Sequence, residues 1–184
     1  MQVHAPRTLQ LSASILTIGA LDGIHLGHQE LIRRASESAQ KLGVPLVVYT
    51  FDPPPKVYFQ HAIMLTSLSE KLERLKLLGA DHVIVAPFDA DYVTRGVRIF
   101  LDELKELHPV EVWEGSDFRF GSNRDGDIST LREHFTVHVV DPILCRYGKV
   151  ISSSRIRALL LQDKREEAAE LLGWSRESSY VPLK

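Results

Sequence analysis

Two histidines in the stretch IGALDGIHLGHQ (residues 18–29) have the type and spacing for chemistry on an anion. His25 and His28 are three residues apart, follow an apolar run, and have glycines around them. The helical period of the next residues places them at the start of a helix, where unpaired N–H groups and partial positive charge attract anions. Imidazole N–H groups can also follow charge that develops on a reacting phosphoryl group. The stretch therefore predicts a phosphate-binding site suited to transfer of a nucleotide.

Two other interpretations of the same stretch stay open. Asp22-Gly23 could form a hairpin turn, although the residues that follow have helical period rather than alternation. Two histidines on one helical face are also common zinc ligands, but no third ligand stands at matching spacing. We therefore favour the phosphate site and expect no metal site made of protein ligands.

Apolar runs and helical patterns alternate along the chain. We predict strands over residues 11–19, 44–51, 82–88, 110–115 and 135–141, and helices over residues 26–42, 67–79, 94–107, 128–134, 152–161 and 164–172. Ser67 and Glu70 have the spacing of a capping box, and Gly79 can end the helix that they begin. This alternation favours a parallel sheet with helices on both faces, in three α/β/α layers.

Unusual loops follow three of the predicted strands. The histidine stretch follows the first strand, FDPPPKVYF follows the second, and GSDFRFGSNRDGD follows the fourth. Ligands of such sheets bind beyond the carboxyl ends of the strands, where the chain direction switches. We therefore expect the three loops to share one edge of the sheet and to form the site there.

Composition and charge restrict the class of protein. With 184 residues, 44% hydrophobic and 25% charged, the chain has the balance of an ordinary globular protein and fits a single domain, residues 1–184. Its 22 basic and 24 acidic residues give no overall basic field to attract nucleic acid. No apolar run approaches the ~20 residues that span a bilayer, and the lone Cys145 cannot form an internal disulfide. We expect a cytoplasmic protein that binds small molecules but neither nucleic acid nor membrane; its oligomeric state is not predicted.

Two segments resemble signatures of the nucleotidylyltransferase superfamily. GIHLGH (residues 23–28) looks like the HxGH signature, and ISSSRIR (residues 151–157) is similar to ISSTxxR, with Ser154 in the threonine position. TFDPPPK, LTSLSEKLERLKLLGADHVIVAPFD and GSDFRFGSNRDGD further resemble the FMN adenylyltransferase module of bacterial FAD synthetases. This similarity runs from about residue 11 to residue 173. It implies the Rossmann-like, doubly wound parallel sheet of the nucleotidylyltransferase fold, with its core over that range.

The resemblance also implies an activity and the residues that carry it. The activity is transfer of AMP from ATP to the phosphate of FMN, which gives FAD and pyrophosphate. The implied catalytic residues are His25, His28 and Arg157. The implied ATP-binding residues are Gly19, Asp22, Gly23, His25, Gly27, His28, Ser153, Ser154 and Arg157. Among them, Ser153, Ser154 and Arg157 are expected to bind the departing pyrophosphate, and Mg²⁺ is expected to be held mainly by the ATP phosphates.

The other two loops are expected to bind the flavin. The implied residues are Pro53, Pro54, Pro55, Tyr58, Phe59, Asp117, Phe118, Arg119 and Phe120. Phe118 and Phe120 have a second interpretation, as side chains that anchor their loop to the core. Asp117 could equally cap a turn.

Some features of the chain differ from the family pattern. Leu21 stands where the first motif usually has Phe, and Pro54 where the second loop usually has His. In the bifunctional enzymes a riboflavin kinase domain follows a segment like ELLGWSRESSY; here only VPLK follows it, so we expect that domain to be absent. Two alternatives stay open: a related nucleotidylyltransferase with another phosphorylated substrate, and a non-catalytic flavin- or nucleotide-binding module.

Overall fold

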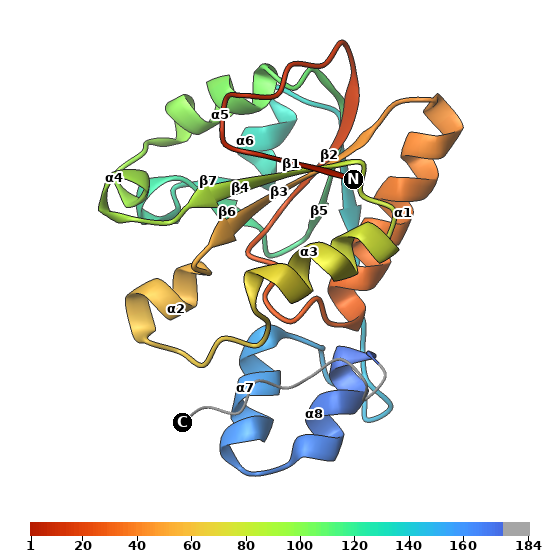
Figure 1. The fold of residues 1–184 in the computed structure, drawn as a ribbon, viewed down its shortest axis with the longest axis vertical. Helices are drawn as coiled ribbons and strands as arrows, with labels where there is room; N and C mark the ends of the chain where they lie inside the picture. The colour runs from red at the N-terminus through yellow and green to blue at the C-terminus, as the bar shows by residue number, and fades with distance from the viewer. Residues whose placement is uncertain (175–184) are drawn as a thin grey trace.

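The protein is built on a six-stranded parallel sheet, seen here in a computed structural model that describes residues 1–174 (Figure 1). The strands are β1 (Gln2–His4), β2 (Ser14–Ile18), β3 (Leu46–Asp52), β4 (His82–Pro87), β5 (Pro109–Gly115) and β8 (Val137–Val140), in the order β1-β4-β3-β2-β5-β8. The chain passes from β2 to β3 on one side and later adds β5 on the other side of β2. The switch point of this doubly wound order therefore lies between β2 and β5.

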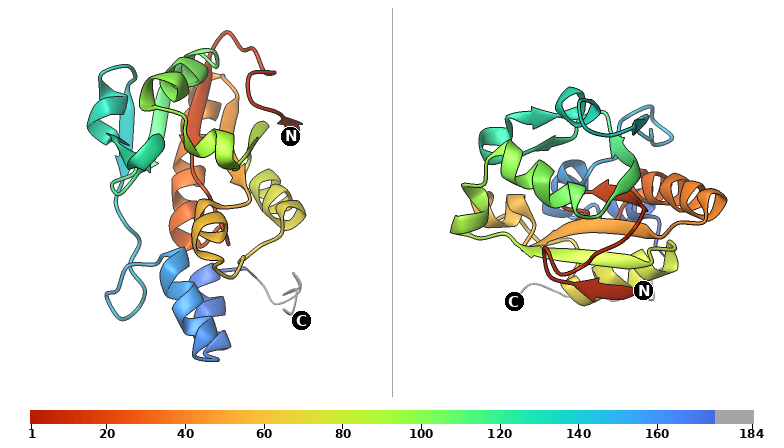
Figure 2. Two further views of the ribbon diagram at one scale, coloured as in Figure 1. Left: turned by 90° about the vertical axis from the view of Figure 1, so that its left-hand side faces the viewer. Right: turned by 90° about the horizontal axis from the view of Figure 1, so that it is seen from above.

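Helices cover both faces of the sheet, which makes three layers (Figure 2). On one face α1 (Leu26–Leu42) and α3 (Leu68–Leu77) contribute Ile32, Ala35 and Leu75 to a buried apolar cluster. On the other face α4 (Ala90–Val93), α5 (Val97–Lys105) and α6 (Ile128–Arg132) pack through a second cluster that includes Phe100 and Leu131. The predicted three-layer α/β fold is confirmed.

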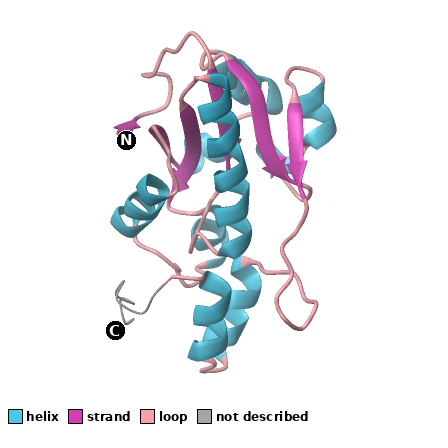
Figure 3. Ribbon diagram, turned by 90° about the vertical axis from the view of Figure 1, so that its right-hand side faces the viewer, coloured by secondary structure: helices cyan, strands magenta, loops and turns pink. Residues whose placement is uncertain are grey.

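Two further helices lie beyond the carboxyl edge of the sheet. The arrowheads of the strands in Figure 3 point towards α7 (Ser153–Leu161) and α8 (Arg165–Leu172). These helices share a third apolar cluster, to which Leu26 of α1 and Leu65 contribute. Their packing therefore brings the second predicted signature to the same edge as the first.

Local signals predicted the long helices well. The predicted helix over residues 26–42 is α1, and Gly43 ends it in the left-handed conformation with φ of 68°. The capping box of α3 is present, because Ser67 accepts from the Glu70 N–H and the Glu70 side chain accepts from the Ser67 N–H. All five predicted strands also occur, as β2, β3, β4, β5 and β8, with ends displaced by a few residues.

Several predicted elements were wrong in detail. Residues 94–107 do not form one helix, because α5 begins only after Gly96 and the separate α4 precedes it. The expected proline loop becomes a short helix, α2 (Pro55–Gln60), whose first residue is a proline, the residue type favoured at the first helical position. Residues 119–127 contain a small hairpin of β6 (Arg119–Phe120) and β7 (Gly126–Asp127), joined through η1 (Ser122–Arg124). Strand β1 was missed, since three residues carry no readable pattern.

The expectation of one domain over residues 1–184 stays a prediction. The segment on which the expected absence of a second domain depends, residues 175–184, lies outside the described residues.

A buried polar contact ties the middle of the sheet to α5. The Tyr49 hydroxyl donates to Glu103 Oε1 at 2.7 Å, and Tyr49 itself is fully buried. The other oxygen of Glu103 lies 3.3 Å from Arg95 Nη1 and 3.6 Å from Arg7 Nε.

We expect Tyr49→Phe to lower the free energy of unfolding by about 1–2 kcal/mol, because the buried Glu103 carboxylate loses a donor. Tyr147→Phe is the matched control, since Tyr147 is 63% exposed and its change should stay within about 0.5 kcal/mol. Urea unfolding of both variants measures the difference. Equal effects would show that the buried contact adds nothing to stability.

Candidate functional site

Three loops leave the sheet side by side at its carboxyl edge. Residues 19–25 follow β2, residues 53–54 follow β3, and residues 116–118 follow β5. Because β3, β2 and β5 are adjacent and parallel, the expectation that the loops share one edge is confirmed. We call residues 19–25 the phosphate loop and residues 53–55 the proline segment.

The two histidines lie at the start of α1, as predicted, and their rings form a stacked pair. His25 is the N-cap, and its Nδ1 accepts the His28 N–H at 3.4 Å. The ring centroids are 3.7 Å apart with an interplanar angle of 17°. In a neutral imidazole an accepting Nδ1 places the proton on Nε2, so His25 Nε2 is a donor. His28 Nδ1 is buried and has no hydrogen-bond partner within residues 1–174.

Both imidazoles are neutral near pH 7 in the free protein. Burial lowers the pKa of His25 to about 4, while the nearby Asp117 carboxylate opposes the shift. Burial, with the charges of His25 and Lys71, lowers the pKa of His28 well below its usual value. A bound polyanion opposes these shifts, so the pair can gain positive charge when phosphate arrives.

The Asp22 carboxylate joins distant segments to the phosphate loop. Its Oδ1 accepts the N–H groups of Leu65 at 3.0 Å and Thr66 at 3.2 Å, and its Oδ2 pairs with the Arg157 guanidinium. Its backbone carbonyl accepts the Ser153 hydroxyl at 2.8 Å. Burial raises the pKa of Asp22, and Arg157 opposes that shift. Asp22 therefore binds other segments of the protein in this structure, and its expected contact with ATP stays a prediction.

The N-terminus of α7 lies against that of α1. Ser152 caps α7 by accepting the Arg155 N–H at 3.3 Å. The Ile151 carbonyl lies 3.8 Å from the place of a Cβ on Gly27, which puts the two helix starts next to each other. Ser154 Oγ accepts a hydrogen bond from Lys56 Nζ of α2. The structure thus brings the two signatures together, although Ser153 and Ser154 both have protein partners.

Arg157 points into the protein. Its Nε donates to the Ile63 carbonyl at 2.8 Å, its Nη2 binds Asp22, and the residue is 7% exposed. The sequence predicts that Arg157 binds pyrophosphate, which stays a prediction. The geometry gives Arg157 a further, structural role. From α7 it binds both Ile63 and Asp22, and it thereby holds residues 63–66 against the phosphate loop.

Gly23 in the phosphate loop and Gly27 in the first turn of α1 are both required by the protein's own packing. Gly23 has φ of 85°, and a Cβ there would lie 3.0 Å from Leu172 and 3.1 Å from Leu65. Its N–H donates to Thr66 Oγ1 at 3.1 Å. At Gly27 a Cβ would lie 3.2 Å from the His25 ring. These glycines therefore let the loop close on itself and on α8, whereas their expected approach to phosphate is untested.

Gly19 and Leu21 also serve the protein interior. The Gly19 N–H donates to the Tyr49 carbonyl at 2.9 Å, which extends the ladder between β2 and β3. Leu21 is 2% exposed and packs in the cluster under α1 and α3. The family's usual Phe at this position is therefore replaced by a core side chain.

A group of aromatic rings stands beside the proline segment. Tyr58 and Phe59 of α2 lie 5.6 Å and 5.7 Å from the Phe88 ring, each nearly edge-on. They are 38% and 58% exposed. Pro54 is buried as the N-cap of α2. Phe88 follows β4 and was missed, because the sequence showed no unusual loop there. Exposed aromatic rings suit a planar apolar ligand. That these residues bind the flavin stays a prediction.

Several side chains of the segment after β5 make contacts within the protein. The rings of Phe118 and Phe120 stack with their centroids 5.6 Å apart. Phe120 is 7% exposed and packs against Phe100, so it anchors the segment to the core. Arg119 Nη1 lies 2.6 Å from Asp127 Oδ2 at the surface. Asp117 is exposed and electrostatically coupled to His25, which keeps it at the site. Contact of this segment with flavin stays a prediction.

Two buried charged side chains under the loops were missed. Lys71 is 1% exposed and binds the carbonyls of Ala20 and Phe51. Glu114 is 1% exposed, accepts the Ile18 N–H at 2.7 Å, and has its pKa raised well above the usual value by burial. A signal existed for Lys71, because Leu75 and Leu78 follow it at helical spacing on the apolar face. Glu114 could have been noticed as an acid inside a predicted buried strand.

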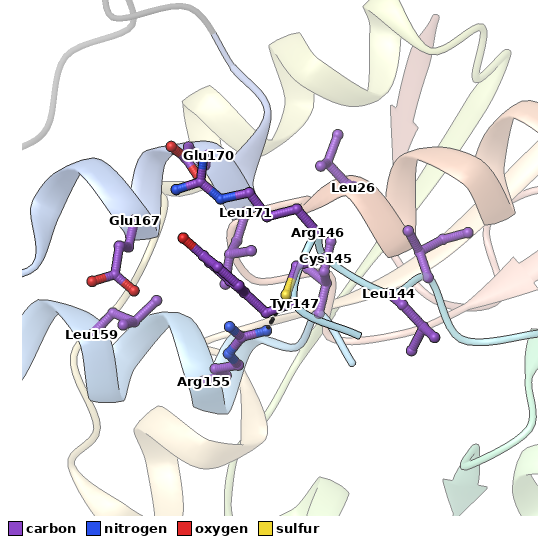
Figure 4. A pocket seen from close by; sticks show the side chains of 12 residues that line it. Leu26, Leu144, Cys145, Arg146, Tyr147, Arg155, Leu159, Glu167, Glu170 and Leu171 are labelled. Atoms are coloured by element: carbon purple, nitrogen blue, oxygen red, sulfur yellow. Dashed lines mark hydrogen bonds and ion pairs between the residues drawn. The ribbon is translucent and has the colours of Figure 1, made fainter. Parts of the chain in front are cut away.

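An apolar cavity of about 200 Å³ adjoins the two helix starts (Figure 4). Leu26, Ile151, Leu159 and Leu171 line it, with Tyr147 reaching in from the 144–150 turn. At its wall Arg155 Nη1 lies 3.1 Å from Cys145 Sγ and lowers the pKa of this free thiol to about 7. The cavity therefore opens beside residues that flank both signatures.

The described residues contain neither a cluster of metal ligands nor a helix that could cross a membrane. Within residues 1–174 no three His, Cys, Asp or Glu side chains are grouped so that they could hold a metal ion. In the same range no helix combines the length and apolar character needed to cross a membrane.

The fold and site define a Rossmann-like α/β protein with a histidine pair and two helix N-termini at the carboxyl edge of its sheet. A sequence model described as FAD synthetase matches residues 8–155, and the chain belongs to this FAD synthetase family. The recognition made from the sequence motifs is thereby confirmed.

Similar proteins share most of this chain. A Geobacillus thermodenitrificans protein called putative bifunctional riboflavin kinase/FMN adenylyltransferase is 49% identical over 97% of the chain and all of that relative. A Haemophilus influenzae bifunctional riboflavin kinase/FMN adenylyltransferase is 35% identical over 92% of the chain, which spans 58% of that relative. A crystal structure titled macrolide-efflux protein, from Streptococcus pneumoniae, has a TM-score of 0.81 at 28% identity; the match covers 93% of this chain and 60% of that chain.

We expect Arg157→Lys to lower the free energy of unfolding by about 2 kcal/mol or more, because one ammonium cannot reproduce the two fixed directions to Ile63 and Asp22. Arg157→Ala should cost about 3–5 kcal/mol, since Asp22 is left buried without its cation. Arg165→Lys is the control, with its side chain 79% exposed. Chemical denaturation measures the free energy of unfolding of all three variants. If Arg157→Lys lost no more stability than Arg165→Lys, the contacts of Arg157 to Ile63 and Asp22 would not stabilise the fold.

The histidine pair predicts a pH dependence of stability. Since the folded pKa values lie below the unfolded value of about 6.5, stability is fully present above that pH and falls as pH drops towards 4, by up to about 1.4 kcal/mol per pH unit for each histidine. His28→Asn should flatten this loss, whereas the exposed His134→Asn should not. Urea unfolding between pH 7.5 and pH 4.5 gives the slopes. An unchanged slope in His28→Asn would contradict the assignment.

Proposed function

We propose that this protein is an FMN adenylyltransferase, which transfers AMP from ATP to the phosphate of FMN and releases pyrophosphate. Membership of the FAD synthetase family supports this function, as do relatives named for FMN adenylyltransferase. The observation that carries it is the meeting of two helix N-termini and a neutral histidine pair at one sheet edge. A site for nucleotidyl transfer needs such donors, because negative charge is concentrated there.

The chemistry needs positioning more than a base. An oxygen of the FMN phosphate attacks the α-phosphorus of ATP; that P–O bond forms as the bond to the β-phosphate oxygen breaks, and the electron pair leaves with pyrophosphate. A phosphate monoester is already largely dianionic at neutral pH, since its second pKa is about 6. His25 Nε2 and the His28 ring donate to phosphate oxygens as charge builds, and the first turn of α7 receives the pyrophosphate.

Substrate places follow from the surfaces around the phosphate loop. The exposed rings of Tyr58 and Phe59, with Phe88 beside them, receive the flavin ring, and Pro53, Pro54 and Pro55 shape the adjoining wall. The apolar cavity beside Leu26 and Ile151 is the place for the adenine ring. The two rings then flank the phosphates, as an in-line transfer requires.

Magnesium fits this site as an ion carried by the nucleotide. The described residues offer no cluster of three ligands, which suits an ion that keeps waters and binds mainly phosphates. Asp117, exposed and coupled to His25, can contact the hydration shell of the ion. Bound Mg²⁺ would neutralise part of the triphosphate charge. A cytoplasmic location, small-molecule partners and independence from nucleic acid and membrane complete the proposal.

The enzyme assay tests the proposal directly. FMN, ATP and Mg²⁺ are mixed with the protein, and flavin fluorescence is followed, because FAD is much dimmer than FMN. We expect fluorescence to fall and chromatography to show FAD. A constant signal over hours would instead indicate a flavin- or nucleotide-binding module or a transferase with another substrate.

His28→Ala should lower turnover by about 10²–10³ while leaving the fold intact, because a donor to the developing charge is lost. His134→Ala, at an exposed position outside the site, is the matched control and should keep wild-type turnover. Full activity in folded His28→Ala would remove His28 from the mechanism.

A further inference from the structure

Lys71 is a buried cation that neither the sequence signatures nor the chemistry above uses. It lies on α3 under the sheet edge and is 1% exposed. Its Nζ donates to the Ala20 carbonyl at 3.0 Å and to the Phe51 carbonyl at 3.0 Å, with Thr50 Oγ1 at 3.5 Å. One ammonium therefore spans the ends of two neighbouring strands.

The two carbonyls lie beside the surfaces proposed for different substrates. Ala20 is in the phosphate loop after β2, whereas Phe51 is the last but one residue of β3, two positions before the proline segment. The Thr50 hydroxyl also donates to the Ala20 carbonyl, at 3.2 Å. The sheet ladder holds the strands together only as far as their last paired residues. Beyond that point, Lys71 and Thr50 set the distance between the two loops.

The charge of Lys71 is costly where it lies. Within residues 1–174 no carboxylate forms an ion pair with it, and burial lowers its pKa, with Asp22 and Asp52 opposing at longer range. Burying a charge without an ion-pair partner costs more free energy than burying an apolar side chain of similar size. Fold stability alone therefore does not account for a lysine at this position, whereas the directed contacts to the Ala20 and Phe51 carbonyls do.

We propose that Lys71 is a positioning residue for adenylyl transfer: it fixes the separation of the phosphate loop and the proline segment, so that the FMN phosphate is held in line with the α-phosphorus of ATP. This inference rests on the proposed function. It predicts that Lys71 acts on turnover when both substrates are bound, and little on the binding of either one. Misplacement of reacting groups by about 1 Å costs on the order of 10²-fold in rate.

The main test is Lys71→Met, which keeps the length of the side chain and removes its three donors. We expect kcat with saturating FMN, ATP and Mg²⁺ to fall about 10²-fold. The Kd of FMN, from fluorescence titration, and the Kd of a non-hydrolysable ATP analogue, from calorimetry, should each change less than about threefold. Lys71→Arg keeps the charge with a different donor geometry, and we expect about a tenfold loss of kcat with near-native thermal stability.

Two controls on the same helix separate positioning from stability. Leu75→Ala removes a fully buried side chain one turn away and should lower thermal stability while kcat per folded molecule stays at the wild-type value. Lys76→Met removes an exposed lysine and should change neither quantity. If Lys71→Met does not fold, Lys71→Arg and Leu75→Ala still decide the question.

The outcomes distinguish this inference from the proposed function. If wild-type protein forms no FAD, the proposed function fails whatever the variants do. If wild-type protein forms FAD and folded Lys71→Met or Lys71→Arg keeps wild-type kcat, only the positioning role is overturned. A more than tenfold weaker ATP analogue Kd with unchanged kcat also overturns it, because Lys71 would then act as a charge for nucleotide binding.

Discussion

The buried ion pair between Asp22 and Arg157 is the constraint on which the site depends. It joins residues that are 135 positions apart, and each partner also binds a further segment: Asp22 binds the amides of Leu65 and Thr66, and Arg157 binds the Ile63 carbonyl. The N-terminus of α7 can therefore lie against α1 only when the phosphate loop and residues 63–66 are in place. Removing one charge leaves the other buried, so the two signatures form as one cooperative unit.

Buried ionisable side chains also hold β2 from its two sides. Glu114 of β5 accepts the Ile18 N–H, while Lys71 of α3 binds the Ala20 carbonyl just beyond the strand. The strand that delivers the phosphate loop is thus fixed by directed polar contacts where apolar packing ends. Apolar contacts tolerate small sliding, whereas short hydrogen bonds to backbone groups specify position. This explains why Lys71 and Glu114 are buried beside this strand although their burial is costly.

The sequence predicted the fold and the location of the site, because both follow from local patterns. Alternating elements predicted the parallel sheet, and the spacing of His25 and His28 before a long amphipathic run predicted their place at the start of α1. Side-chain direction could not be predicted in the same way. Arg157 and Ser153 were assigned to pyrophosphate from motif position, yet in the structure they bind Ile63 and Asp22, which only the folded chain brings near. The short helix α2 was hidden because its prolines also fit a loop.

The two halves of the site differ in how far the protein has already built them. On the proposed nucleotide side, His25 and Asp22 are buried and make hydrogen bonds within the protein, so their arrangement is well defined by the fold itself. On the proposed flavin side, Tyr58 and Phe59 are exposed on a helix of six residues and contact the Phe88 ring. In a site of this kind, the side chains lose little conformational entropy when the phosphates bind and more when the flavin binds. The proposed role of Lys71 fits this difference. Because Lys71 binds both the Ala20 and the Phe51 carbonyls, it fixes the strand end that leads to α2 relative to the well-defined phosphate loop.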